Sequence, residues 1–342
     1  MERDSKMTVS PHLIGIGAGL VAAALFASLA NNSTLAVTLF YLTPLPILLA
    51  GIGWGVRAAQ LAFATAALLV AIVLSLTTAF AFSLYIGLPG VLLSHLMLLR
   101  RELPADAPDS VPPAGAGPAV EWYPLGRIVA WASLMAGGLV ALGLMMLGGD
   151  GEGYRHAVKS IFDENALKQL QTILGADFGQ EQFNRFVERF IRYILPAFAG
   201  GFWLLIMLAN LWLAAKSAAI SGQLARPLPS FAGLDYPPLL LAGFAVAAAL
   251  TFASGLVGLV GTAFLGGFSC AYLILGLAVV HVMAAGSQLK MLLLGLLYTG
   301  LFLTPWVPPI LVLMGLAEPF LQLRRRVTQR PAPPASRAGP HL

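Results

Sequence analysis

The sequence predicts an all-α fold, a polytopic bundle of about ten transmembrane helices and of eight at the fewest. Hydrophobic residues make up 58% of its 342 residues and charged residues only 10%, whereas soluble domains carry about a quarter charged residues. The mean hydropathy is +0.83, and the apolar residues stand in long blocks rather than at the spacing of a soluble core. We therefore expect lipid to be the solvent of most of this chain.

The apolar blocks are long enough to cross a bilayer, which requires about 20 residues of helix. The first block is longer than the roughly 7–15 apolar residues of a signal peptide, so we expect a retained helix. The last block, 289–323, has room for two short segments that meet at Pro305, Pro308 and Pro309. A re-entrant piece in 58–99 or 289–323 would lower the count to eight or nine. The other predicted spans are 12–30, 35–53, 58–76, 79–99, 126–147, 191–215, 238–260 and 264–285.

The segments between the spans complete the predicted organisation. Residues 100–124 are rich in proline, alanine and glycine and cannot bury enough apolar surface to fold, so they predict a flexible linker. The predicted regions are a cytoplasmic N-terminus (1–11), a first transmembrane group of four helices (12–99), the linker (100–124), one helix (125–148), an extracytoplasmic region (149–190), a second group of about five helices (191–323) and a basic, disordered cytoplasmic tail (324–342).

Basic residues predict the orientation, because short cytoplasmic loops collect Lys and Arg. With the N-terminus inside, 14 of the 20 Lys and Arg fall on the cytoplasmic side. The remaining six lie between 155 and 192, in or just after the outer region, where seven acidic residues balance them. We expect a bacterial inner (cytoplasmic) membrane protein with both termini in the cytoplasm. The high pI of 9.5 then reflects orientation and not nucleic-acid binding.

The outer region carries two amphipathic runs. The first begins near Tyr154, and the second runs from Phe183 to Ile194 after a plausible capping arrangement at Asp177 and Gln180. Such helices can lie in the headgroup plane or cover a cavity mouth. A simple connector, a lid and a docking surface for a partner all remain open.

No pattern in the sequence indicates an enzyme. The single cysteine, Cys270, excludes an intramolecular disulfide and any cysteine cluster for zinc or iron–sulfur. Nucleotide loops, catalytic triads and zinc-protease helices have no counterpart here. We predict no catalytic residue, no cofactor and no metal site, and a chain that cannot by itself drive transport with ATP.

Polar residues within the spans are few, and each is a candidate site because burying polar groups in lipid is costly. Asn210 lies deep in the sixth span, where its amide can bond to a neighbouring helix or contact a substrate. Glu318 is two turns from the arginines at 324–326, so it can pair with them or bind a proton or ligand. His95 and His281 are each isolated near a helix end and predict packed or interfacial histidines.

Two apolar features also indicate function. The first helix carries a ridge of small residues at every fourth position, which lets another helix of this chain or of a partner approach closely; it comprises Gly15, Gly19, Ala23 and Ala27. Leu-Thr-Pro segments occur near both ends of the chain, and helices broken in corresponding halves can mark a transporter site or can arise by chance. These candidate broken-helix residues are Pro44, Pro46, Pro305 and Pro308.

The segment Pro44-Leu45-Pro46-Ile47, running into Gly51-Ile52-Gly53-Trp54-Gly55, and the order of spans around a large outer region resemble the YybS-like family of bacterial membrane proteins. That family is similar to the substrate-binding S components of energy-coupling-factor transporters and to cell-shape proteins of the MreD type. The resemblance implies that the small-residue ridge could dock on a coupling subunit. S components have about six helices, however, so the larger span count here departs from them.

Two functions follow as hypotheses. The first is a transporter-like or substrate-binding membrane component for a small apolar or amphipathic molecule, favoured by the broken segments and the resemblance. The second is a non-transporting scaffold or assembly factor in envelope or cell-division processes, favoured by the scarcity of polar groups in the spans. Beyond the lipid bilayer, the expected partners are a membrane subunit at the first helix and an unidentified small molecule, with no nucleic acid.

Overall fold

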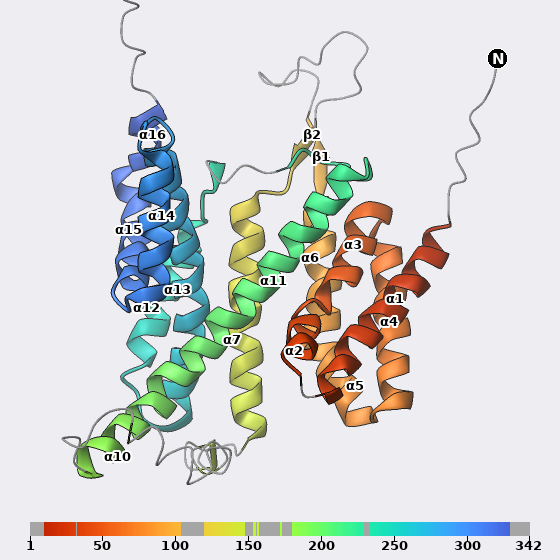
Figure 1. The fold of residues 1–342 in the computed structure, drawn as a ribbon, viewed down its shortest axis with the longest axis horizontal. Coiled ribbons are helices and arrows are strands. Elements are labelled where there is room, and N and C mark those ends of the chain that lie inside the picture. Colours follow the sequence, from red (N-terminus) through yellow and green to blue (C-terminus); the bar gives the residue numbers. More distant parts are fainter. Residues whose placement is uncertain are drawn as a thin grey trace, which may run out of the picture. The chain divides into compact units, whose positions relative to one another are not determined.

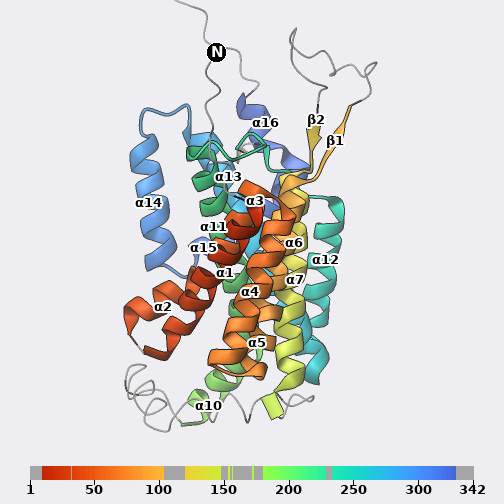
Figure 2. The ribbon, with the colours of Figure 1, turned by 90° about the vertical axis from the view of Figure 1, so that its right-hand side faces the viewer.

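The computed structural model describes residues 10–31, 33–103, 120–147, 153–154, 156, 172, 180–228 and 233–328. Within them the chain is helical except for one short pair of strands, which confirms the all-α class. It divides into two compact units, and helix α13 contributes its first half to one unit and its second half to the other. Figures 1 and 2 show the helices of each unit.

The first unit comprises residues up to 229 together with 236–268. Short connections join the helices from α1 to α6, as expected for spans that are neighbours in sequence. Its elements are α1 (Pro11–Ala27), η1 (Ser28–Asn31), α2 (Thr34–Tyr41), α3 (Pro44–Trp54), α4 (Val56–Val73), α5 (Leu76–Phe82), the π-helical η2 (Ser83–Gly87), α6 (Leu88–Leu98), β1 (Arg100–Glu102), β2 (Val120–Trp122), α7 (Leu125–Met146), α10 (Gln180–Arg189), the π-helical η3 (Phe190–Ile194), α11 (Leu195–Ile220), α12 (Pro238–Leu250) and the start of α13 (Gly255–Ala284).

The second unit comprises residues 230–235 and 269–342. Its helices are the second half of α13, α14 (Lys290–Leu303), α15 (Val307–Leu321) and α16 (Leu323–Thr328). Glycines let α13 and α15 touch: a Cβ on Gly276 would lie 2.0 Å from the carbonyl oxygen of Leu311, and one on Gly315 would lie 2.0 Å from that of Tyr272. The two backbones are therefore in direct contact.

Seven of the described helices are long and apolar enough to cross a membrane, or eight when a bent pair is included. This agrees with a polytopic bundle and falls below the ten crossings expected. The predicted span 238–260 is wrong, because α12 has 13 residues and the chain turns before Gly255, which has a φ of +62°. The following helix starts earlier than expected and runs for 30 residues.

The last apolar block forms the bent pair. Helices α14 and α15 are long and apolar enough to span a membrane only when taken together, and they are bent by 119° at the break. At 1.5 Å per residue each is about 21–22 Å long, which is shorter than the roughly 30 Å hydrocarbon core. A bend beyond a right angle turns the chain back on itself, so α14 and α15 form a hairpin and not a straight span.

Three further boundaries differ from the prediction. The second amphipathic run is not separate from the sixth span, because α10, η3 and α11 form one continuous helical stretch from 181 to 220. The ends of the predicted linker pair as antiparallel strands, with Arg101 and Glu121 ion-paired at 2.6 Å. The predicted disordered tail begins instead as α16. Most of the first amphipathic run, the linker interior 104–119 and the chain after 328 lie outside the described residues.

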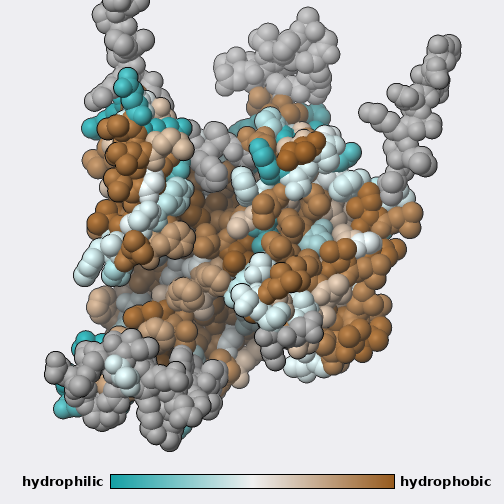
Figure 3. Space-filling view, in the orientation of Figure 1, coloured by the Kyte–Doolittle hydropathy of each residue, from teal (hydrophilic) through white to brown (hydrophobic). Residues whose placement is uncertain are grey.

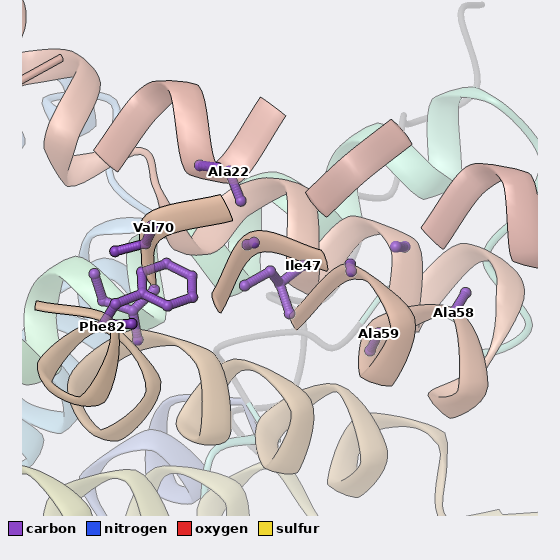
Figure 4. Packing of buried hydrophobic residues seen from close by; sticks show 12 residues of the cluster. Ala22, Ile47, Ala58, Ala59, Val70 and Phe82 are labelled. Carbon is purple, nitrogen blue, oxygen red and sulfur yellow. The ribbon is translucent and has the colours of Figure 1, made fainter. Parts of the chain in front are cut away.

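The core of the first unit is built from small side chains. Figure 4 shows Ala22 of α1, Ile47 of α3, and Ala58 and Ala59 of α4 in one cluster, with Val70 and Phe82 filling its far end. Alanines here let the helices approach closely where lipid provides no hydrophobic force between them.

The small-residue ridge of α1 packs inside this unit. A Cβ on Gly15 would lie 2.8 Å from the carbonyl oxygen of Ala58, and one on Gly19 would lie 2.6 Å from that of Ala62, both in α4. Ala23 is buried and Ala27 is half-buried. The ridge is thus occupied by α4, so a partner subunit could meet only the opposite face of α1.

That opposite face belongs to a broad apolar surface. Figure 3 shows hydrophobic residues over the sides of the helices and hydrophilic ones near the β-ribbon and α16. Large apolar side chains stay exposed on several helices, among them Leu13, Leu68, Ile72, Leu76 and Phe198. A surface of this kind would aggregate in water, and in lipid it needs no protein cover.

Candidate functional site

Helix α11 completes the hydrogen bonding of a broken span. The segment Thr34–Trp54 crosses as α2 and α3, interrupted at Leu42 and Thr43. Pro44 has no N–H, and Leu45 donates to the carbonyl of Leu42, so the carbonyl of Tyr41 lacks its helical donor. The Nδ2 of Asn210 in α11 donates to that oxygen at 2.9 Å.

Asn210 is itself almost fully buried and is anchored to its own helix. Its Nδ2 also donates to the carbonyl of Ile206 at 2.8 Å, while its Oδ1 has no partner within the described residues. Pro44 is buried and Pro46 half-buried at the start of α3. The sequence candidates Pro44, Pro46 and Asn210 are therefore brought together in one packed place.

A second irregular segment is closed by the same face of α11. Tyr85 lies in the π-helical turn η2, and Pro89, four residues further on, has no N–H to donate to its carbonyl. Trp203 donates to that oxygen from Nε1 at 3.0 Å. Trp203 and Asn210 are seven residues apart, which places them on the same side of α11. The Tyr85 hydroxyl donates to the carbonyl of Leu139 in α7 at 3.1 Å. These two hydrogen bonds hold α11 and α7 against η2.

The proline-broken segment of the second unit is more exposed than the break at Pro44. Pro305 is exposed at the break between α14 and α15, and Pro308 is half-buried in the first turn of α15. Phe302 and Trp306 beside them are also largely exposed. His281 accepts or donates at its Nε2 with the Tyr298 hydroxyl at 3.3 Å, which links α13 to α14.

Glu318 is held by the chain's own groups. Its carboxylate accepts from the backbone N–H groups of Leu323 and Arg324 at 2.9 and 3.2 Å, and from Nε of Arg324 at 2.9 Å. The same guanidinium reaches Asp235 at 2.8 Å. The residue between the helices, Gln322, has a φ of +48°, so this carboxylate caps α16 across a sharp corner.

The first unit also contains an open groove of about 660 Å³ between α4, α6 and α7, with η2 in its wall. Its volume lies within the range of about 300–1,000 Å³ usual for ligand sites. Apolar side chains form most of its surface. The lining residues are Val56, Gln60, Leu84, Leu88, Pro89, Val91, Leu92, His95, Met135, Gly138 and Leu139.

The polar side chains of this groove gather at one end. Gln60 is five residues into α4 and His95 is three residues from the end of α6, both close to the helix ends marked by Arg57 and Arg100. Neither side chain bonds to any other described residue, and both are exposed. Leu84 lies 11 residues before His95, about 16 Å along the helix.

This arrangement suits an elongated amphipathic molecule. One end of the groove offers an imidazole and an amide, both of which can donate or accept a hydrogen bond. The other end offers leucine side chains beside η2. Among the described residues no group of three or more His, Cys, Asp or Glu is placed to hold a metal ion.

The chain matches a protein family over most of its length. Residues 20–318 match the family described as "Predicted membrane protein (DUF2232)". The chain belongs to this family. Its membership agrees with the YybS-like resemblance and with the apolar helices, and it supports a polytopic membrane protein. No curated protein and no solved structure matches the chain.

Sequence reasoning did not identify the groove. His95 was expected to be packed or interfacial, and Gln60 was not singled out, although a glutamine inside an apolar span is a visible signal. The π-helical turn has no sequence signature of comparable strength. The groove itself depends on how α4, α6 and α7 meet, which no local pattern reports.

Proposed function

We propose that this membrane protein is a binding component, of transporter-like type, for a small amphipathic molecule. The ligand's polar group meets His95 and Gln60, and its apolar part lies toward Leu84 between α4, α6 and α7. The observation that carries this proposal is an apolar groove whose two polar side chains, at one end, have no hydrogen-bond partner among the described residues. Polar groups that orient a ligand within an apolar pocket are the usual composition of such sites.

The groove can be blocked at Gly138 with little disturbance of packing. A Cβ at this glycine meets only the tip of Phe264, at 3.9 Å, whereas the adjacent Gly137 would place its Cβ 2.2 Å from the same ring. Gly138→Phe therefore adds its ring on the groove side. Gly17→Phe is the matched control, because Gly17 is an equally open helical position in the same unit, on α1.

The test is purification of the full chain in lipid nanodiscs, followed by mass spectrometry of the extracted small molecules and lipids. We expect one molecule at near-stoichiometric amount with the wild type and with Gly17→Phe, and at least a tenfold loss with Gly138→Phe. His95→Ala should lower retention of the same molecule. Equal retention by Gly138→Phe, or no enriched molecule with the wild type, would overturn the proposal.

The orientation is proposed on the basic residues at the helix ends. We place the protein in an inner (cytoplasmic) membrane with both termini inside, because Arg57, Arg100 and Arg127 mark one side of the first unit. Single cysteines can test this in a Cys270→Ser background. A cysteine introduced after residue 330 should resist a membrane-impermeant maleimide in intact spheroplasts, and one introduced at Ser33 should react.

A further inference from the structure

Arg226 is a buried cation outside the candidate spans. It lies in the connection that follows α11, and only 9% of its surface is exposed. Its Nη1 donates at 3.4 Å to the carbonyl of Met97, at the end of α6, and at 3.3 Å to that of Tyr123, just before α7. The guanidinium also lies over the ring of Trp122, 5.7 Å from its centroid.

The side-on edge of this guanidinium is unused. Its Nε is buried without a partner in the described part of the chain, and Nη2 donates to no described residue. Nε and Nη2 together form the edge that binds carboxylate or phosphate in a bidentate manner. Arg226 forms no ion pair with any residue in the described part of the chain, and the neighbouring acid Glu121 is paired with Arg101.

A buried charge without a counter-ion is costly. Burial lowers the pKa of Arg226 because desolvation disfavours its charged form. Arginine nevertheless stays protonated in proteins. An anion beside the guanidinium would offset this desolvation.

Two more arginines surround the same aromatic pair. Arg100 lies 5.8 Å from the centroid of Trp122, and Arg127 lies 5.9 Å from that of Tyr123. The guanidiniums of Arg100 and Arg226 share one ring, so they are no more than about 12 Å apart. Both Arg100 and Arg127 are exposed and so can be reached from outside.

The aromatic residues indicate the depth of this cluster. Trp and Tyr concentrate at the level of lipid headgroups, and basic pockets at helix ends on the cytoplasmic side bind anionic headgroups. Trp131 of α7 extends the pair by donating from Nε1 to the Tyr123 hydroxyl at 3.2 Å. At that depth the most abundant anion is the phosphate of a lipid.

We propose that Arg226, Arg100 and Trp122 form a binding site for the phosphate of an anionic phospholipid at this end of the first unit. The lipid phosphate accepts from Nη2 of Arg226, and from the buried Nε once the atoms that cover it move aside, and the exposed Arg100 attracts the headgroup. Its acyl chains remain in the bilayer. The site is separate from the groove and stands whether or not the groove binds a ligand.

The test compares lipids and variants of the full chain in a neutral detergent. Phosphatidylglycerol is titrated against phosphatidylcholine, with binding read by native mass spectrometry and by the shift in Tm. We expect the wild type to retain one more phosphatidylglycerol than phosphatidylcholine. Arg226→Gln and Arg100→Gln should each weaken that preference, by about tenfold for Arg226 and less for Arg100, since its guanidinium is already solvated.

Arg101→Gln is the matched control, because Arg101 neighbours Arg100 on the ribbon and is engaged with Glu121. It should keep the lipid preference. If Arg226→Gln does not fold, Arg100→Gln decides, since an exposed side chain is removed without disturbing the core. Unchanged preference in Arg100→Gln, or equal stabilisation by inorganic phosphate at the same concentration, would overturn the proposal, the latter by indicating a soluble anion.

Discussion

Replacing Asn210 by leucine should destabilise the first unit by about 1–2 kcal/mol. The substitution keeps the size of the side chain and removes the donor to the Tyr41 carbonyl. An orphaned buried acceptor costs about 1–3 kcal/mol, and side-chain hydrogen bonds between membrane helices average about 0.6 kcal/mol with a maximum near 1.7. Loss of the unpartnered Oδ1 offsets part of the cost, which places the expected value in the middle of these ranges.

The control for this prediction is Thr43→Val in the same break. The Thr43 hydroxyl donates to the carbonyl of Phe40 at 2.6 Å, but the backbone N–H of Thr43 also donates to that carbonyl, so no acceptor is orphaned. Its cost should be clearly smaller. Reversible unfolding in mixed micelles with increasing SDS measures both free energies.

A coupled variant tests the mechanism. In a Pro44→Ala/Pro46→Ala background, the N–H groups at 44 and 46 are restored and Leu45 can donate to Tyr41 again. Asn210→Leu should then cost less than it does in the wild type, which a double-mutant cycle detects. If Asn210→Leu is neutral, or costs no more than Thr43→Val, the carbonyl of Tyr41 does not depend on α11 and the reasoning is refuted.

Four further substitutions, one of them a control, test the packing of both units. Trp203→Phe should cost about 1–2 kcal/mol in the same unfolding assay, because it orphans a carbonyl in η2; a neutral result would contradict that role. Gly276→Ala should destabilise the second unit, since its Cβ would clash with the α15 backbone, whereas the unobstructed Gly295→Ala should stabilise α14 by up to about 1 kcal/mol. Equal effects of Gly276→Ala and Gly295→Ala on stability would exclude a close approach of α13 to α15. Glu318→Leu should lower the free energy of local unfolding of α16 by about 3 kcal/mol, because it leaves the buried Arg324 without this carboxylate. Tryptic cleavage within α16 should then be faster, and an unchanged cleavage rate would show that the carboxylate is dispensable.

The break at Pro44 shows how far sequence reasoning reaches at a candidate site. Two prolines in an apolar block predict an interrupted helix, because each removes a backbone donor. Asn210 is visible in the sequence as an amide inside a span. The hydrogen bond from Asn210 to the Tyr41 carbonyl at the break joins positions 169 residues apart, and it forms only because α11 packs on α3.

The boundaries that differed have similar physical causes. The apolar content of 238–260 does not reveal the turn before Gly255, where the backbone leaves the helix through a positive φ. The first residues of the basic tail became helical because Glu318 and Asp235 bind Arg324, a partnership set by a corner in the chain. Hydropathy averages over about 20 residues and cannot register either event.

The sequence by itself determined that this is a polytopic helical membrane protein, where most of its spans lie and where prolines interrupt them. These properties follow from apolar length and from missing backbone donors, both of which are local. The tertiary structure decided which donors close the interrupted ladders, that α1 uses its small-residue ridge on α4, and that a groove opens beside η2. The donors that close the ladders come from more than a hundred residues away, because within lipid a polar group must find its partner in a neighbouring helix. The ridge and the groove likewise depend on how separate helices pack, which no local pattern determines.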